Sequence, residues 1–200
     1  MWRRVCQEAG GQLQRTGLLR DTNLGNILPT DNRRLECVVN GLPPLGQQLA
    51  VDATLVNPLK RTEDARPQAH CKDGVALAEA RKDKERKYPE LLIGTRCRLV
   101  VVAMEVGGRW SEEAHYFLET LAEARAKAAP KALKGSTFQA CKRRWTAMLA
   151  VAGMRSLAHT LLEEPGTTEL HLGGEVSLAE LLGEDNYAKE PAVSRMPARA

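Results

Sequence analysis

Apolar and polar residues alternate along two stretches in the first third of the chain, and this alternation predicts two β-strands. Within 35–40 every second position, beginning with Leu35, is apolar, as in a strand with one buried face. The second stretch, 49–56, is rich in Val, Leu and Thr, and it ends just before Pro58. Because only a short turn over 41–46 separates them, the two strands should pair antiparallel.

A helix and a third strand are expected next. Asp73 can cap a helix that runs to about Tyr88 or Leu92. The third strand, 98–106, contains a continuous apolar run and should be buried on both faces. A helix of this length is a crossover, so the second and third strands should lie parallel.

Two further helices follow the third strand. Ser111 and the glutamates after it open the first in the manner of a capping box, and Pro130 ends it. The second is expected over 136–162, where apolar residues recur at helical spacing and place Trp145 in the core.

The order of elements predicts an α/β fold, bordering on α+β, with a small mixed sheet flanked by helices. We expect a weakly ordered N-terminal segment over 1–33, the folded domain over 34–163, and a flexible acidic-to-polar tail over 164–200.

Composition narrows the class of protein. The 200 residues are 43 % apolar and 4 % aromatic, which suits one domain and excludes a collagen or a wholly disordered chain. Since no apolar run is long enough to cross a bilayer, we expect no membrane contact and no export. The five cysteines lack any C-x-x-C pair, so a disulfide framework and a zinc finger are not expected. The expected location is intracellular, nuclear or cytoplasmic.

The chain has 29 basic and 25 acidic residues, which gives a net charge of +4. These charges are distributed unevenly along the sequence. Basic residues gather on the crossover helix and in 127–144, whereas 163–190 is acidic. Basic groups of this kind could contact the phosphates of DNA, which is the favoured partner, or of RNA. The candidates are Lys82, Lys87, Lys142, Arg143 and Arg144. The alternative for Lys82 and Lys87 is a solvated helix face.

Three charged residues stand where the pattern favours apolar ones. Asp52 lies in the middle of the second strand, Glu36 lies on the strand before it, and Lys84 lies on the Tyr88 face of the crossover helix. A carboxylate is costly to bury without a partner. Alternatively, Asp52 faces water on an edge strand or pairs with an arginine, and Glu36 is simply exposed.

Together these residues suggest a metal-dependent phosphodiesterase. Two neighbouring carboxylates, Glu36 and Asp52, are what Mg²⁺ needs from a protein. The ion lowers the pKa of a bound water, and Lys84 would orient that water or stabilise the transition state. No small-molecule cofactor is expected.

Five segments in this order also resemble a known family. They are Arg33–Val38, Gln48–Val56, Lys84–Leu91, Arg98–Val102 and Glu105–Glu113. The arrangement resembles the region that follows the reverse transcriptase in non-LTR retrotransposon polyproteins of some large protist genomes. That region is similar to the restriction-endonuclease-like domain of site-specific retroelements, within the PD-(D/E)XK nuclease superfamily. The resemblance covers residues 5–163.

The resemblance implies a restriction-endonuclease-like core and Mg²⁺-dependent nicking of DNA, which leaves a 3′-hydroxyl to prime reverse transcription. Glu36 would be the first acidic residue, Asp52 the second, and Lys84 the catalytic lysine, with Tyr88 one turn later. The chain departs from the family because Leu35 precedes the first acid in place of proline, and Thr54 stands where the lysine is usual. The chain therefore resembles a fragment of a longer polyprotein. Its alternatives are a non-catalytic nucleic-acid-binding module and a non-functional remnant.

Overall fold

The computed structural model describes residues 1–42, 46–60, 62 and 64–162. These residues belong to one compact unit that spans Met1–Glu163. The predicted tail, 164–200, lies outside the described residues.

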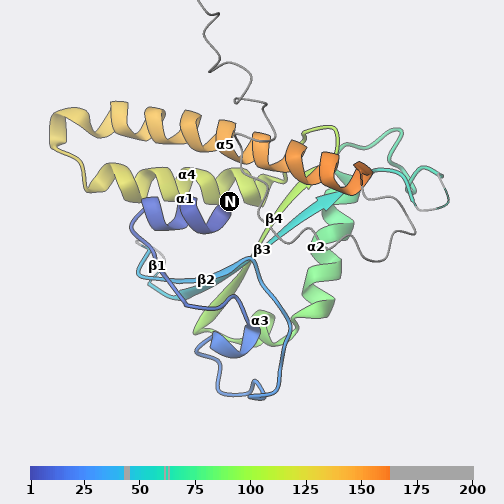
Figure 1. Ribbon diagram of the computed structural model, residues 1–200, viewed down its shortest axis with the longest axis horizontal. Helices are drawn as coiled ribbons and strands as arrows, with labels where there is room; N and C mark the ends of the chain where they lie inside the picture. The colour runs from blue at the N-terminus through green and yellow to red at the C-terminus, as the bar shows by residue number, and fades with distance from the viewer. Residues whose placement is uncertain (43–45, 61, 63, 163–200) are drawn as a thin grey trace, which may run out of the picture. The chain divides into compact units, whose positions relative to one another are not determined.

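The centre of this unit is a four-stranded mixed sheet in the order β1-β2-β3-β4 (Figure 1). Its strands are β1 (Gln12–Leu13), β2 (Cys37–Asn40), β3 (Gln48–Val56) and β4 (Cys97–Glu105). β1 and β2 are antiparallel, as are β2 and β3, whereas β3 and β4 are parallel over nine residue pairs. The α/β class, the antiparallel hairpin and the parallel crossover are thereby confirmed.

One face of the sheet packs on the crossover between β3 and β4. This crossover consists of α2 (Val75–Lys87) and the single turn α3 (Glu90–Ile93). Val38 and Ala50 point to this side and join a cluster that includes Leu77 and Tyr88. Most of α2 faces water, and the helix packs on the sheet through a narrow apolar stripe that consists of Ala76, Leu77 and Ala80.

The other face packs on three helices that Figure 1 shows on the opposite side of the sheet. They are α1 (Trp2–Glu8), α4 (Glu112–Lys127) and α5 (Lys134–Leu162). The Ser111 hydroxyl accepts a hydrogen bond from the Ala114 N–H and caps α4, as predicted. α5 packs along α4 and buries Trp145, which is 1 % exposed and confirms the predicted core position.

Residues 1–33 lie within the folded unit, whereas the sequence pattern places the start of the domain at 34. Trp2, Val5 and Cys6 of α1 are buried in the same cluster as α4 and α5. The Trp2 ring stacks on Phe117 with centroids 5.7 Å apart and meets Trp110 edge to face at 6.0 Å. α1 is too short to show a helical period, so the burial of its apolar residues depends on partners from distant parts of the chain.

Candidate functional site

Asp52 and Lys84 meet beneath α2. The strand alternation places Asp52 on the α2 face of β3, together with Ala50, and opposite Val101 of β4. Its carboxylate Oδ2 lies 2.9 Å from the Lys84 ammonium Nζ. The two side chains are 9 % and 19 % exposed, so this ion pair is shielded from solvent and from salt. Asp52 is therefore buried and paired with a lysine, rather than exposed or paired with an arginine.

The Asp52 carboxylate is incompletely satisfied. Among the described residues, Oδ2 has no partner with hydrogen-bond geometry, and the contact with Lys84 is a close approach of charges. The Lys84 ammonium compensates the charge of this oxygen, so the ion pair offsets the free energy that burial of the carboxylate costs.

Tyr88 completes this group of side chains at the end of α2. Its ring is fully buried, and its hydroxyl donates a hydrogen bond to the backbone oxygen of Arg34. Burial first, and then the neighbouring Asp52 carboxylate, raise the pKa of the Tyr88 phenol. The phenol therefore stays protonated beside the carboxylate.

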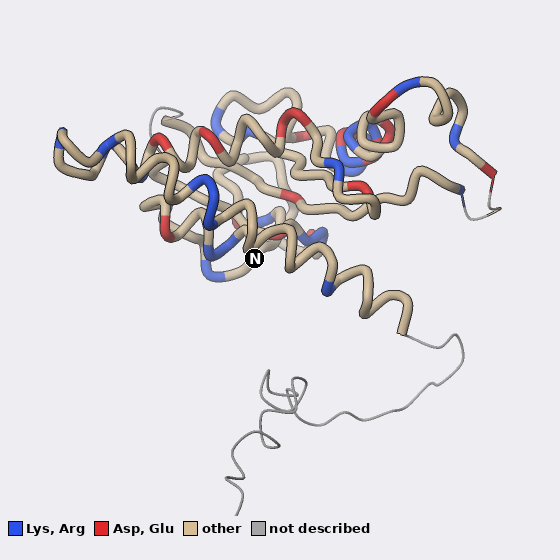
Figure 2. The backbone as a smooth tube through the Cα atoms, turned by 90° about the horizontal axis from the view of Figure 1, so that it is seen from above, with Lys and Arg blue, Asp and Glu red and all other residues tan. Residues whose placement is uncertain are grey.

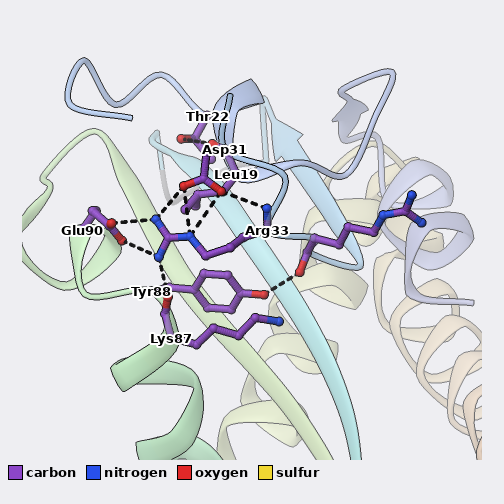
Figure 3. Close-up of polar contacts among 8 residues, drawn as sticks. Leu19, Thr22, Asp31, Arg33, Lys87, Tyr88 and Glu90 are labelled. Atoms are coloured by element: carbon purple, nitrogen blue, oxygen red, sulfur yellow. Dashed lines mark hydrogen bonds and ion pairs between the residues drawn. The ribbon is translucent and has the colours of Figure 1, made fainter. Parts of the chain in front are cut away.

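Arg33 holds the segment before β2 against this end of α2 (Figure 3). Its guanidinium donates to both Asp31 and Glu90, with Nη2 distances of 2.7 and 2.6 Å, and also to the Lys87 carbonyl at the helix end. It also lies over the Tyr88 ring, 6.0 Å from the centroid. Hydrogen bonds from Arg33 lower the pKa of both carboxyls. The sequence pattern missed this network, because Arg33 and Glu90 are 57 positions apart and no local spacing links them.

Glu36 lies apart from Asp52. It occupies a bend before β2, and its carboxylate Oε1 is 3.1 Å from the Met1 amino nitrogen. It also lines a cavity of about 330 Å³ on the α1 and α5 side of the sheet, together with Ala53 and Trp110. The side chains of Glu36 and Asp52 therefore lie on opposite faces of the sheet.

This separation decides how well the residues fit Mg²⁺. Across the described residues, no group of three or more His, Cys, Asp or Glu side chains is placed to hold a metal ion. Asp52 supplies one carboxylate, whose Oδ2 atom contacts the Lys84 ammonium, and Mg²⁺ can bind through one carboxylate together with substrate phosphates. Glu36 does not fit as the second ligand in this arrangement.

The two predicted phosphate-contacting residues on α2, Lys82 and Lys87, lie on different sides of the helix. Lys82 is exposed and makes no ion pair within the described part of the chain. The Lys87 ammonium lies 5.0 Å from the centroid of the Tyr88 ring. Lys87 therefore lies on the side of Tyr88 and Lys84, whereas Lys82 points to solvent on another side of the helix.

The other three predicted residues lie on α5, on the opposite side of the sheet. Lys142 pairs with Glu119 at 2.6 Å and Arg144 pairs with Glu8 at 2.7 Å, while Arg143 is exposed. Figure 2 shows basic and acidic positions interspersed over several elements rather than a surface of one sign. The five residues therefore do not form one nucleic-acid surface.

Comparisons with protein-family models, curated proteins and solved structures found no match for this chain. Every helix within the described ranges is too short or too polar to cross a membrane.

Proposed function

We propose that this chain is a retrotransposon-derived, restriction-endonuclease-like domain that binds DNA and presents Asp52 and Lys84 to a phosphodiester group. The observation that supports this function is the shielded ion pair between these two side chains, with a distance of 2.9 Å. Such a domain would act in the nucleus, where its DNA target lies.

The placement of this pair suits phosphodiester chemistry. The ammonium of Lys84 can neutralise charge that develops on a phosphate oxygen, and its low exposure makes that interaction stronger than at the surface. Asp52 holds the ammonium in place through its Oδ2 atom. The buried Tyr88 ring limits the space beside that oxygen and excludes water from one side.

Asp52 is the residue that would hold a magnesium ion in this site. When bound, the ion supplies a water of lowered pKa and neutralises a phosphate. The residues of this chain would then orient the phosphate through Lys84 and keep the far side of the carboxylate dry.

A nicking assay with two matched carboxylate variants tests this proposal. Supercoiled plasmid is incubated with Mg²⁺ and wild type, Asp52→Asn or Glu36→Gln. We expect nicking by wild type and Glu36→Gln, and at least a hundredfold loss in Asp52→Asn, whose fold is checked by circular dichroism. Equal nicking by all three proteins would contradict a role for Asp52.

A second function, DNA binding without cleavage, is favoured by the position of Glu36 on the opposite face of the sheet. It predicts that no divalent metal supports nicking, while the protein still binds a DNA duplex with an affinity that falls steeply with salt. Asp52→Asn would leave that affinity unchanged.

A further inference from the structure

A polar cavity of about 370 Å³ lies between α1 and the segment that leads into β2. Arg3 enters it from α1, and Arg34 and Glu36 enter it from the segment before β2. The remaining wall is the loop over 16–18. The cavity therefore joins residues from three separate parts of the first 36 positions.

Backbone contacts give the cavity a defined wall. The Leu35 N–H donates to the Gly17 carbonyl at 2.7 Å, and Leu18 forms an isolated bridge with Arg34. A Cβ at position 17 would lie 2.6 Å from the Leu35 carbonyl oxygen. Glycine is thus the residue that allows the two segments to approach so closely.

The two arginines of the cavity are available to a ligand. Within the described residues, neither the Arg3 nor the Arg34 guanidinium makes an ion pair or hydrogen bond, whereas the neighbouring Arg4 and Arg33 are held by carboxylates. Glu36 carries the one acidic side chain of the lining, and its carboxylate contacts the Met1 amino group. The cavity therefore has a surplus of positive charge.

The main chain of Arg34 links the cavity, on the α1 side of the sheet, to the site on the α2 side. The backbone oxygen of Arg34 accepts the hydrogen bond of Tyr88, the residue beside Asp52. In addition, the register that pairs Cys37 with Val51 sets the residues before β2 alongside the second half of β3. A nucleic-acid strand bound at Lys84 would pass the main chain of Arg34 to place another of its phosphates in the cavity.

We infer that Arg3 and Arg34 bind a phosphate group of the nucleic acid that occupies the Asp52–Lys84 site. Guanidinium groups suit this ligand because they donate two parallel hydrogen bonds to phosphate oxygens. This inference rests on the proposed function and adds a second anchor point, which fixes the direction of the DNA strand across β3.

The test measures the affinity for duplex DNA as a function of salt concentration, for wild type and for Arg3→Gln/Arg34→Gln. The slope of log affinity against log salt falls by about 1 for each phosphate contact that is lost, so the double variant, which loses one phosphate, should lower it by about 1. Arg125→Gln/Arg155→Gln is the matched control, since both residues are exposed and unpaired in the described structure, on α4 and α5. That control should keep the wild-type slope.

A wild-type slope in the Arg3→Gln/Arg34→Gln variant would overturn the inference and leave DNA binding by the domain intact. Failure of the wild type to bind DNA at low salt would overturn the proposed function and the inference with it. An equal loss of slope in the Arg125→Gln/Arg155→Gln control would also overturn the inference, because binding would then follow net charge. Selective shifts of the Arg3 and Arg34 Nε–H resonances on titration with the same duplex would support it.

Discussion

The two faces of the sheet bury different kinds of side chain. Towards α1, α4 and α5 the core is aromatic and aliphatic, with Trp2, Phe117 and Trp145 in one cluster. Towards α2 the core is aliphatic except where Asp52, Lys84 and Tyr88 meet. Buried charge costs free energy that apolar packing must offset. The aromatic face therefore stabilises the unit, while the α2 face carries an arrangement that stability alone does not explain.

The largest expected effect comes from breaking the buried pair on the α2 face. Lys84→Met leaves the Asp52 carboxylate without its partner, and removing one member of a buried pair costs about 3–5 kcal/mol. Urea unfolding measures this loss. Arg86→Met is the control on the same helix, because Arg86 and Asp83 form an exposed pair worth about 0.5 kcal/mol.

The double variant Asp52→Leu/Lys84→Met sharpens that result. Replacing both charges by apolar groups of similar size should recover most of the lost stability. A double variant as unstable as Lys84→Met would show that packing, rather than the unpaired charge, caused the loss.

A truncation on the aromatic face should cost slightly less. Leu149 is 3 % exposed in the cluster around Trp145, and Leu149→Ala should lower the free energy of unfolding by about 2–4 kcal/mol. Val151→Ala, on the same helix but 58 % exposed, should change it by about 0.5 kcal/mol or less. Similar losses in the two variants would contradict the assignment of these faces of α5.

Tyr88→Phe probes the polar face without removing a charge. The buried ring stays, but the Arg34 carbonyl loses its hydrogen bond, so the free energy of unfolding should fall by about 1–1.5 kcal/mol. Thermal unfolding of the purified protein measures the change. An unchanged or raised stability would mean that water replaces the hydroxyl at no cost.

The smallest effect is a dependence on pH that arises at the aromatic face. Hydrogen bonds from Trp145, and then from Arg144 and Arg4, lower the pKa of Glu8 to about 2. A carboxyl with a depressed pKa stabilises the folded state above its ordinary range, and this contribution disappears as the pH falls from about 4.5 towards 2. Glu8 is partly exposed, so the loss should be about 1 kcal/mol.

Urea unfolding at pH 5.5 and pH 2.5 checks this sign. Wild type should lose about 1 kcal/mol more than Glu8→Gln between the two pH values. Parallel losses in the two proteins would assign the acid sensitivity to other carboxyls, such as Asp31 and Glu90, whose pKa values are also lowered.

Much of the fold could be predicted because it follows local patterns. The alternation in β3, the apolar run of β4 and the crossover length between them indicate a parallel pair, which the structure contains. The alternation in β3 and the helical spacing in α2 put Asp52 and Lys84 on facing sides, and their side chains meet. Period and length suffice here because burial of one strand face or one helix stripe leaves few arrangements.

The surroundings of the site could not be predicted in this way. Nothing local indicates that Arg33 would join Asp31 and Glu90, or that Glu36 would contact the first residue rather than Asp52. A bend before β2 turns the Glu36 side chain away from the α2 face, although its position in the strand pattern matches that of Asp52.

The sequence by itself determined strands β2, β3 and β4, helices α2, α4 and α5, and which of their residues face inward, because these depend on the periodic burial of apolar groups within one segment. Only the tertiary structure decided the partners of each charge and the place of residues 1–33 in the core. The physical reason is that an isolated charge or a short apolar helix carries no period. Its environment is set by segments that the fold brings together from distant parts of the chain.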